Sequence, residues 1–218
     1  DIGCKLIVED IVDFDFSGIL DDVDVIFHLA GLLGTTELFH RVIEAEKVNV
    51  LGTLNLLEAM KKCNVRNIVF TSKPNVWKYN VYTITKENCE RYLEMYHRMF
   101  KFNVAIARLY NVYGPGEDVK EYRKAVPYFI ISALKNEPLE VFGDGRQTMD
   151  LIYIDDAVEA LTRCAEIMPG EVVEIGSSKS VKVIDLAYRI IKLTGCSSRV
   201  VFRPMRRGEE GNSIIHAN

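Results

Sequence analysis

The sequence lacks the features that mark several large classes of protein. No apolar run in its 218 residues approaches the length of about 18 residues that a transmembrane helix needs, so no membrane span is expected. It has no long basic run and a formal net charge of -4, which argues against a nucleic-acid groove. Its first ten residues, DIGCKLIVED, contain no charged segment followed by an apolar one, so no signal peptide is expected.

Cysteine and histidine are also scarce. The 5 cysteines are scattered, odd in number and without a CxxC pair, which indicates reduced thiols in a cytoplasmic protein. The 4 histidines form no HxxxH or HExxH pair, so we expect no metal site. The remaining composition, 48% hydrophobic and 27% charged, is that of an ordinary globular protein. The length suits one large domain, or one domain with a small second lobe.

Short apolar runs alternate with longer segments of helical periodicity in the first half of the chain. Such runs predict strands buried on both faces of a parallel sheet, and the alternation predicts an open α/β fold. The expected strands are Lys5–Val8, Val23–Ala30, Ile68–Thr71 and Val104–Leu109. The expected helices are Glu37–Lys62 and Val81–Phe100.

The second half changes character after a loop rich in glycine, proline and charge. We expect Asp155 and Asp156 to cap one helix, Ser180 to cap the next, and Gly195 to end it. The expected strands are Leu139–Phe142, Leu151–Ile154, Val172–Ile175 and Val200–Phe202. The expected helices are Ala125–Lys135, Asp155–Ile167 and Val181–Thr194.

One spacing suggests chemistry. Tyr82 and Lys86 are four residues apart, so on a helix they share a face, and the ammonium favours the phenolate form of the tyrosine. A tyrosine of this kind can act as an acid or base at neutral pH. The pattern alone is weak, because Tyr188 and Lys192 repeat it. Tyr82, however, opens a helix just after a buried strand, and open α/β sheets bind ligands at that end of their strands.

Several further motifs occur in a recognisable order. They are Glu9-Asp10-Ile11, the Val25–Gly31 segment VIFHLAG, the Asn49–Thr53 segment NVLGT, Phe70-Thr71-Ser72, Tyr82 with Lys86, the Arg108–Pro115 segment RLYNVYGP, and the GDG and IDD segments at 143–145 and 154–156. Together they resemble the extended short-chain dehydrogenase/reductase family, in particular its NAD-dependent nucleotide-sugar epimerases and dehydratases.

The resemblance implies roles for individual residues. Catalytic roles fall on Tyr82, Lys86, Lys73 and Ser72. Contacts with NAD fall on Asp10, Ile11, Leu29, Ala30, Gly31, Asn49, Thr71, Tyr82 and Lys86. Contacts with a nucleoside-diphosphate sugar fall on Asn111, Val141, Arg146 and Arg207.

The sequence departs from the family pattern in three ways. The opening strand and its GxxGxxG phosphate loop are absent, so we expect the chain to lack both of the family's ends. Lys73 stands where the family has a Ser or Thr that binds the reacting sugar oxygen, and Thr71 or Ser72 could take over that role. Met149 replaces an arginine that contacts the diphosphate, for which Arg146, or Arg206 with Arg207, could substitute.

These residues predict a Rossmann-type doubly wound sheet over 1–113 and a substrate lobe over 114–218, with segments returning to the sheet. Dehydratases carry an acidic pair where this chain has Pro74 and Asn75, so an epimerase acting through a 4-keto sugar is favoured. A dehydratase, a decarboxylase, a ketosugar reductase and a non-catalytic NAD-binding regulator remain alternatives. The resemblance also implies a homodimer, and NAD is not distinguished from NADP.

Overall fold

A four-stranded parallel sheet forms the centre of the computed structural model, which describes residues 3–74, 79–117, 123–167, 170, 172–209 and 216–217. All neighbouring strands of this sheet pair in parallel, as the continuous apolar runs predict. The prediction of a Rossmann-type α/β fold is confirmed. The strand order is β1 (Ile26–His28), β2 (Asn67–Ser72), β3 (Asn103–Leu109) and β7 (Val172–Ile175).

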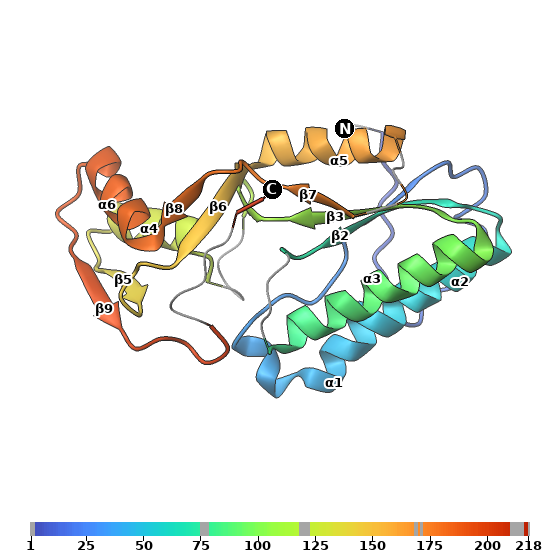
Figure 1. The fold of residues 1–218 in the computed structure, drawn as a ribbon, viewed down its shortest axis with the longest axis horizontal. Coiled ribbons are helices and arrows are strands. Elements are labelled where there is room, and N and C mark those ends of the chain that lie inside the picture. Colours follow the sequence, from blue (N-terminus) through green and yellow to red (C-terminus); the bar gives the residue numbers. More distant parts are fainter. Residues whose placement is uncertain are drawn as a thin grey trace.

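Helices cover both faces of this sheet (Figure 1). On one face lie α2 (Gly52–Lys62) and α3 (Val81–Phe100), and on the other lies α5 (Ile154–Ile167). Successive residues of β2 point to opposite faces, so Phe70 packs into the core beneath α2 and α3 while Val69 packs beneath α5. The bounds of α3 agree with the prediction, and no helix in the described ranges is long and apolar enough to cross a membrane.

A smaller lobe stands beside the carboxyl ends of the sheet strands (Figure 1). Its core gathers Phe129, Leu139, Val141 and Ala187, which are buried together. Its sheet has the order β4 (Asn111–Tyr113), β6 (Thr148–Tyr153) and β8 (Ser180–Lys182), beside the parallel pair β5 (Leu139–Phe142) and β9 (Val200–Arg203). Its helices are α4 (Ala125–Leu134) and α6 (Val183–Thr194).

The single helix predicted over Glu37–Lys62 is divided in the structure. A short 3₁₀ turn and a first α-helical turn precede a wider π-helical segment, which continues into α2. A π-helical segment changes the direction in which its side chains point, and sequence periodicity does not reveal it. The divided elements are η1 (Glu37–His40), α1 (Val42–Ala45) and η2 (Glu46–Leu51).

One predicted strand does not form, and two others have different bounds in the structure. Lys5–Val8 forms no strand, because it has no ladder partner among the described residues, and Leu6 is 85% exposed. The run Val23–Ala30 contains only the three strand residues of β1. The strand expected at Leu151–Ile154 begins earlier, at Thr148, and α5 follows it without a loop.

Of the predicted helix caps, only the stop at Gly195 agrees with the structure. Asp155 and Asp156 do not precede α5 but lie inside its first turn. The helix dipole stabilises carboxylates in this position. Ser180 belongs to β8, which pairs antiparallel with β6, so the helix starts later than predicted, at Val183. Gly195 ends α6 in the left-handed conformation, with φ of 64°, as predicted.

Candidate active site

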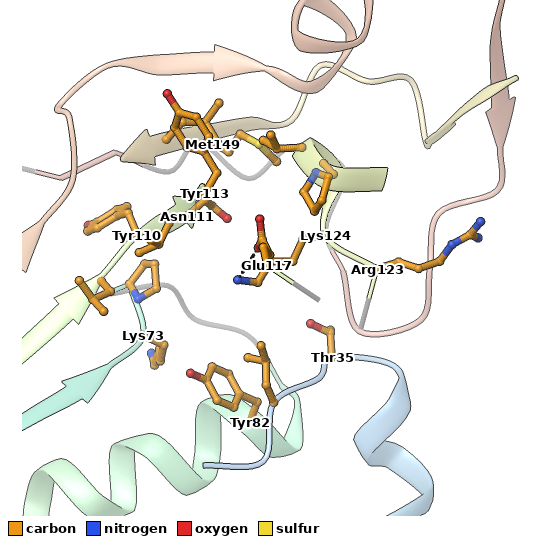
Figure 2. Close-up of a pocket in the computed structure, with 18 of the residues that line it drawn as sticks. Thr35, Lys73, Tyr82, Tyr110, Asn111, Tyr113, Glu117, Arg123, Lys124 and Met149 are labelled. Carbon is orange, nitrogen blue, oxygen red and sulfur yellow. Dashed lines mark ion pairs between the residues drawn. The ribbon is translucent and has the colours of Figure 1, made fainter. Parts of the chain in front are cut away.

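A cavity of about 630 Å³ lies between the carboxyl ends of the sheet strands and the small lobe. Its walls combine the end of β2, the start of α3, the segment from Leu109 to Tyr113, and residues of α4, β5 and β6. Figure 2 shows Tyr82 and Lys73 at one side of this cavity, with Asn111 and Met149 at the other. Open α/β sheets bind ligands in this position, where strand ends and helix starts converge.

Tyr82 is placed in the cavity by the beginning of α3. Asn80 caps this helix, because its side-chain oxygen accepts a hydrogen bond of 2.8 Å from the backbone nitrogen of Thr83. Asn80 is itself buried, so the first turn of α3 is fixed against the cavity wall. The predicted position of Tyr82, at a helix start beyond the end of a buried strand, is therefore what the structure contains.

Lys86 lies one turn further along α3 and is buried. Its ammonium donates a hydrogen bond of 2.8 Å to the carbonyl oxygen of Thr71 and lies 4.4 Å from the centre of the Phe70 ring. Burial lowers the pKa of Lys86 to about 8, although the charge of Glu90 opposes this shift. The ammonium is thus held at the end of β2, on the same helix face as Tyr82.

Asn49 ties three segments together beside Lys86. Its side-chain oxygen accepts a hydrogen bond of 2.6 Å from the Leu32 backbone nitrogen, and its nitrogen donates to the hydroxyl of Thr85 at 2.9 Å. A Cβ atom at Gly31 would lie 3.3 Å from the Asn49 oxygen and 3.5 Å from the Lys86 ammonium. Glycine at 31 therefore lets the backbone after β1 pass closely over both side chains.

The two hydroxyls at the end of β2 have partners inside the protein. Ser72 donates a hydrogen bond of 2.5 Å to the carboxylate of Glu90, which also binds Arg108 through two nitrogen atoms. The Thr71 hydroxyl donates to the carbonyl oxygen of His28 at 3.3 Å. Arg108 and Glu90 thus form an ion pair inside the protein.

Lys73 lies in the cavity wall next to these hydroxyls. Its side chain is only 5% exposed, and its ammonium contacts the carboxylate of Glu87 on α3 at 2.7 Å. A buried ammonium needs such a partner, because burial of a charge without compensation is costly.

Of the residues assigned to the cofactor, Leu29, Thr71 and Tyr82 line this cavity, and the others are not among its described lining residues. Asp10 accepts a hydrogen bond of 2.9 Å from the Val12 backbone nitrogen and so stabilises a turn. Ile11 packs against α2 where a Cβ at Gly52 would lie 2.6 Å from it. Ala30 is exposed on the segment that follows β1.

The residues assigned to the substrate divide into two groups. Asn111 lines the cavity and donates a hydrogen bond of 3.0 Å to the carbonyl oxygen of Asp150. The structure does not bring Val141 to the cavity, because it is buried in the core of the small lobe. Arg146 is an exposed partner of Asp144, and Arg207 lies over the ring of Phe39. Neither arginine is among the described residues that line the cavity.

Arg206 and Met149 line the cavity instead. Arg206 pairs with Glu209, and its Nε atom is buried with no hydrogen-bond partner among the described residues. A buried donor of this kind is suited to an anionic ligand. Sequence reasoning named Arg206 only together with Arg207, since the two are adjacent and spacing does not separate an inward side chain from an outward one.

Sequence reasoning missed Glu87 and Glu90 altogether. Both lie on α3, and Glu90 is four residues beyond Lys86, so helical spacing could have placed it on the same face. Glu87 could not have been found in this way, because its partner Lys73 comes from the end of β2. Among the described residues, no cluster of three or more histidine, cysteine, aspartate or glutamate side chains could hold a metal ion.

Comparison with known proteins gives consistent matches along the chain. A family model described as "NAD dependent epimerase/dehydratase family" matches residues 8–176. The chain is 31% identical over 204 residues to a putative UDP-glucose 4-epimerase of Methanocaldococcus jannaschii, covering 86% of this chain and 67% of that protein. Other relatives are described as decarboxylases and 4,6-dehydratases. The chain spans between about half and two thirds of the length of such curated relatives.

Two solved structures have closely similar folds. One is a UDP-N-acetylglucosamine 4-epimerase from Methanobrevibacter ruminantium M1 in complex with UDP-N-acetylmuramic acid, with a TM-score of 0.89 and 27% identity over 96% of this chain and 72% of that one. The other is a UDP-glucuronic acid 4-epimerase from Bacillus cereus in complex with UDP-glucuronic acid and NAD. Its TM-score is 0.85, with 28% identity over 94% of this chain and 70% of that one.

Proposed function

The chain belongs to the NAD-dependent epimerase/dehydratase family, and on that premise we propose that it is part of an NAD-dependent epimerase of a nucleoside-diphosphate sugar. The observation that carries this proposal is that Tyr82 and the end of β2 meet at one cavity, while Lys86, one helical turn beyond Tyr82, is hydrogen-bonded to the end of β2. The cavity has the volume of a small-molecule site and mixes apolar walls with a few polar groups.

The residues after β1 and β2 fit a cofactor laid over the ends of these strands. A Cβ at Gly31 would lie 3.3 Å from the Asn49 oxygen and 3.5 Å from the Lys86 ammonium, so glycine leaves the space beside these two side chains open. We assign cofactor contacts to Leu29, Ala30, Gly31, Thr71, Tyr82 and Lys86. Asn49 holds the backbone of the segment after β1 in place. Asp10 and Ile11 keep the cofactor contacts that the resemblance implies. When bound, NAD supplies a reversible acceptor for hydride.

In the proposed reaction Tyr82 removes the proton of a sugar hydroxyl as the carbon that bears this hydroxyl is oxidised to a ketone, and it returns the proton when the ketone is reduced again. The positive charge of Lys86, one helical turn away, lowers the free energy of the phenolate form. Lys73 binds the reacting end of the sugar. Ser72 is less suited to that role than Lys73, because its hydroxyl already donates to Glu90.

We assign substrate contacts at the other side of the cavity to Asn111 and to Arg206, whose buried Nε has no hydrogen-bond partner among the described residues and suits an anion such as a diphosphate. Arg146, Arg207 and Val141 receive no such role, because they lie outside the cavity wall. Pro74 lines the cavity where a dehydratase would carry an acid, and this supports an epimerase over a dehydratase. Asn75, the other position of that comparison, lies outside the described residues.

The test is incubation of the full-length protein, supplied with NAD, with UDP-glucose, UDP-N-acetylglucosamine and UDP-glucuronic acid. Proton NMR should show conversion of at least one sugar to its 4-epimer with no net consumption of NAD. Loss of CO₂ or elimination of water would identify a decarboxylase or a dehydratase, and stoichiometric oxidation of NADH or NADPH in a parallel incubation that contains it would identify a reductase. Binding of NAD without turnover of any nucleotide sugar would favour a regulatory protein.

We further propose that the protein is a homodimer that forms through the helical regions Glu37–Lys62 and Val81–Phe100. Ile84, Tyr92, Met95 and Met99 are apolar residues of α3 that remain exposed in the single chain, as does Ile43 on α1. Apolar exposure along a helix pair is typical of a bundle-forming interface. Sedimentation of the full-length protein at micromolar concentration should give a dimer.

We also propose a cytoplasmic location, which the five free cysteines support.

A further inference from the structure

The charged side chains of the cavity wall are unevenly matched. Six of them form three ion pairs in which both partners line the cavity: Lys124 with Glu117 at 2.8 Å, Arg123 with Glu140 at 3.5 Å, and Arg206 with Glu209 at 2.5 Å. The seventh is Lys73. The described part of the wall therefore carries one more positive than negative side chain.

Lys73 differs from the other cations in where its carboxylate partner lies. Glu87, which it contacts at 2.7 Å, is not among the described residues that line the cavity, and its side chain is 41% exposed. Lys73 lines the cavity from a buried position, whereas the carboxylate of Glu87 is exposed to solvent and lies outside the described lining. Solvent screens the charge of Glu87 more than that of Lys73, so the ammonium adds positive potential to the cavity.

This potential is placed at the end of the cavity where Tyr82 lies (Figure 2). Under the proposed function, on which this inference rests, that end receives the reacting sugar, whereas Arg206 is assigned to the diphosphate. We propose that Lys73 selects a nucleotide sugar that bears a carboxylate, a hexuronic acid, and that its ammonium pairs with this carboxylate. An ammonium and a carboxylate form a charge-assisted hydrogen bond, which a neutral hydroxymethyl group at the same position cannot match.

The test compares the affinity of the NAD-loaded full-length protein for a hexuronate and for the matching neutral hexose by calorimetric titration. UDP-glucuronic acid is compared with UDP-glucose, and the dTDP forms of both sugars are run in parallel. The wild type should bind the glucuronate at least about 10-fold more tightly, the factor expected of a hydrogen bond between charged groups. Lys73→Met, which keeps the length of the side chain, should abolish that ratio, because it weakens binding of the glucuronate more than binding of the glucose form.

Glu87→Gln is the matched control. If Lys73 only ties the end of β2 to α3, removing either partner breaks the same contact, and both variants should change binding alike. If Lys73 recognises the sugar, Glu87→Gln should keep or increase the preference for glucuronate, because the carboxylate that shares the ammonium is gone. Because the preference is a ratio measured on one preparation, partial unfolding of a variant does not imitate its loss.

Equal binding of both sugars by the wild type would overturn the inference and leave the proposed epimerase intact. A preference that survives in Lys73→Met would also overturn it. Failure to bind any of the four nucleotide sugars would overturn the proposed function together with the inference.

Discussion

The ammonium of Lys86 donates a hydrogen bond of 2.8 Å to the carbonyl oxygen of Thr71 and so joins α3 to the carboxyl end of β2. Because the ammonium is buried, the pKa of Lys86 is lowered to about 8, close to physiological pH. His28, on the neighbouring strand, has a pKa lowered to about 3 by burial and by the charge of Lys86, so it is neutral here. The ammonium of Lys86 is therefore fixed in position, but its protonation state is sensitive to the charges around it.

Replacement of Tyr82 by phenylalanine should reduce kcat at least about 100-fold, because it removes a positioned group for proton transfer. Tyr188→Phe is the matched control, since Tyr188 also precedes a lysine by four residues on a helix but is 57% exposed on α6. Steady-state rates on whichever nucleotide sugar the wild type turns over provide the measurement. Turnover by Tyr82→Phe at the wild-type rate would show that another group moves the proton.

Replacement of Glu90 by glutamine should move the basic limb of the pH profile of kcat/KM to lower pH. The negative charge of Glu90 raises the pKa of Lys86 against the effect of burial, so its removal lets the ammonium lose its proton earlier. The loss of activity on that limb then begins at a lower pH than in the wild type.

Glu94→Gln removes a carboxylate of the same helix that pairs with Arg98 in solvent and should leave the limb in place. A folded Glu90→Gln variant with an unchanged profile would contradict the role assigned to the charge of Glu90. Circular dichroism should accompany this measurement, because Glu90 also binds Arg108 in a partly buried ion pair.

Replacement of Asn80 by alanine should lower the free energy of unfolding by about 1 kcal/mol, the usual effect of removing an N-cap. The side chain of Asn80 accepts the hydrogen bond of Thr83 at the start of α3, where Tyr82 lies. Asn80→Ser should retain most of the stability, since serine caps helices well. Urea unfolding checks both variants, and equal loss in the two would indicate that capping is not the cause.

Replacement of Gly52 by alanine should destabilise the protein by about 1–3 kcal/mol, in contrast to the usual gain from alanine within a helix. The new Cβ would lie 2.6 Å from the side chain of Ile11. In an Ile11→Ala background the clash is removed, and the same change should stabilise the helix by up to about 1 kcal/mol. A double-mutant cycle from urea unfolding measures the difference, and additive effects would rule out the contact.

The sequence by itself determined the fold class and the position of the residues at the centre of the candidate site. Continuous apolar runs are typical of strands buried on both faces of a parallel sheet, and β2 and β3 formed where two of those runs occur. The bounds of α3 followed from its periodicity, and its start placed Tyr82 and Lys86 on one face. These features depend on residues close together in the chain, whose spacing is fixed by helix and strand geometry.

Only the tertiary structure decided features that depend on partners distant in sequence. Lys5–Val8 has strand-forming residues but forms no strand, since a strand requires a neighbour and none of the described residues pairs with it. Ser180 joined β8 because β6 offered hydrogen bonds along its edge. Likewise, two carboxylates of α3 bind residues at the end of β2: Glu87 binds Lys73, and Glu90 binds Ser72. Contacts of this kind depend on how elements pack, which the spacing of residues along one element does not encode.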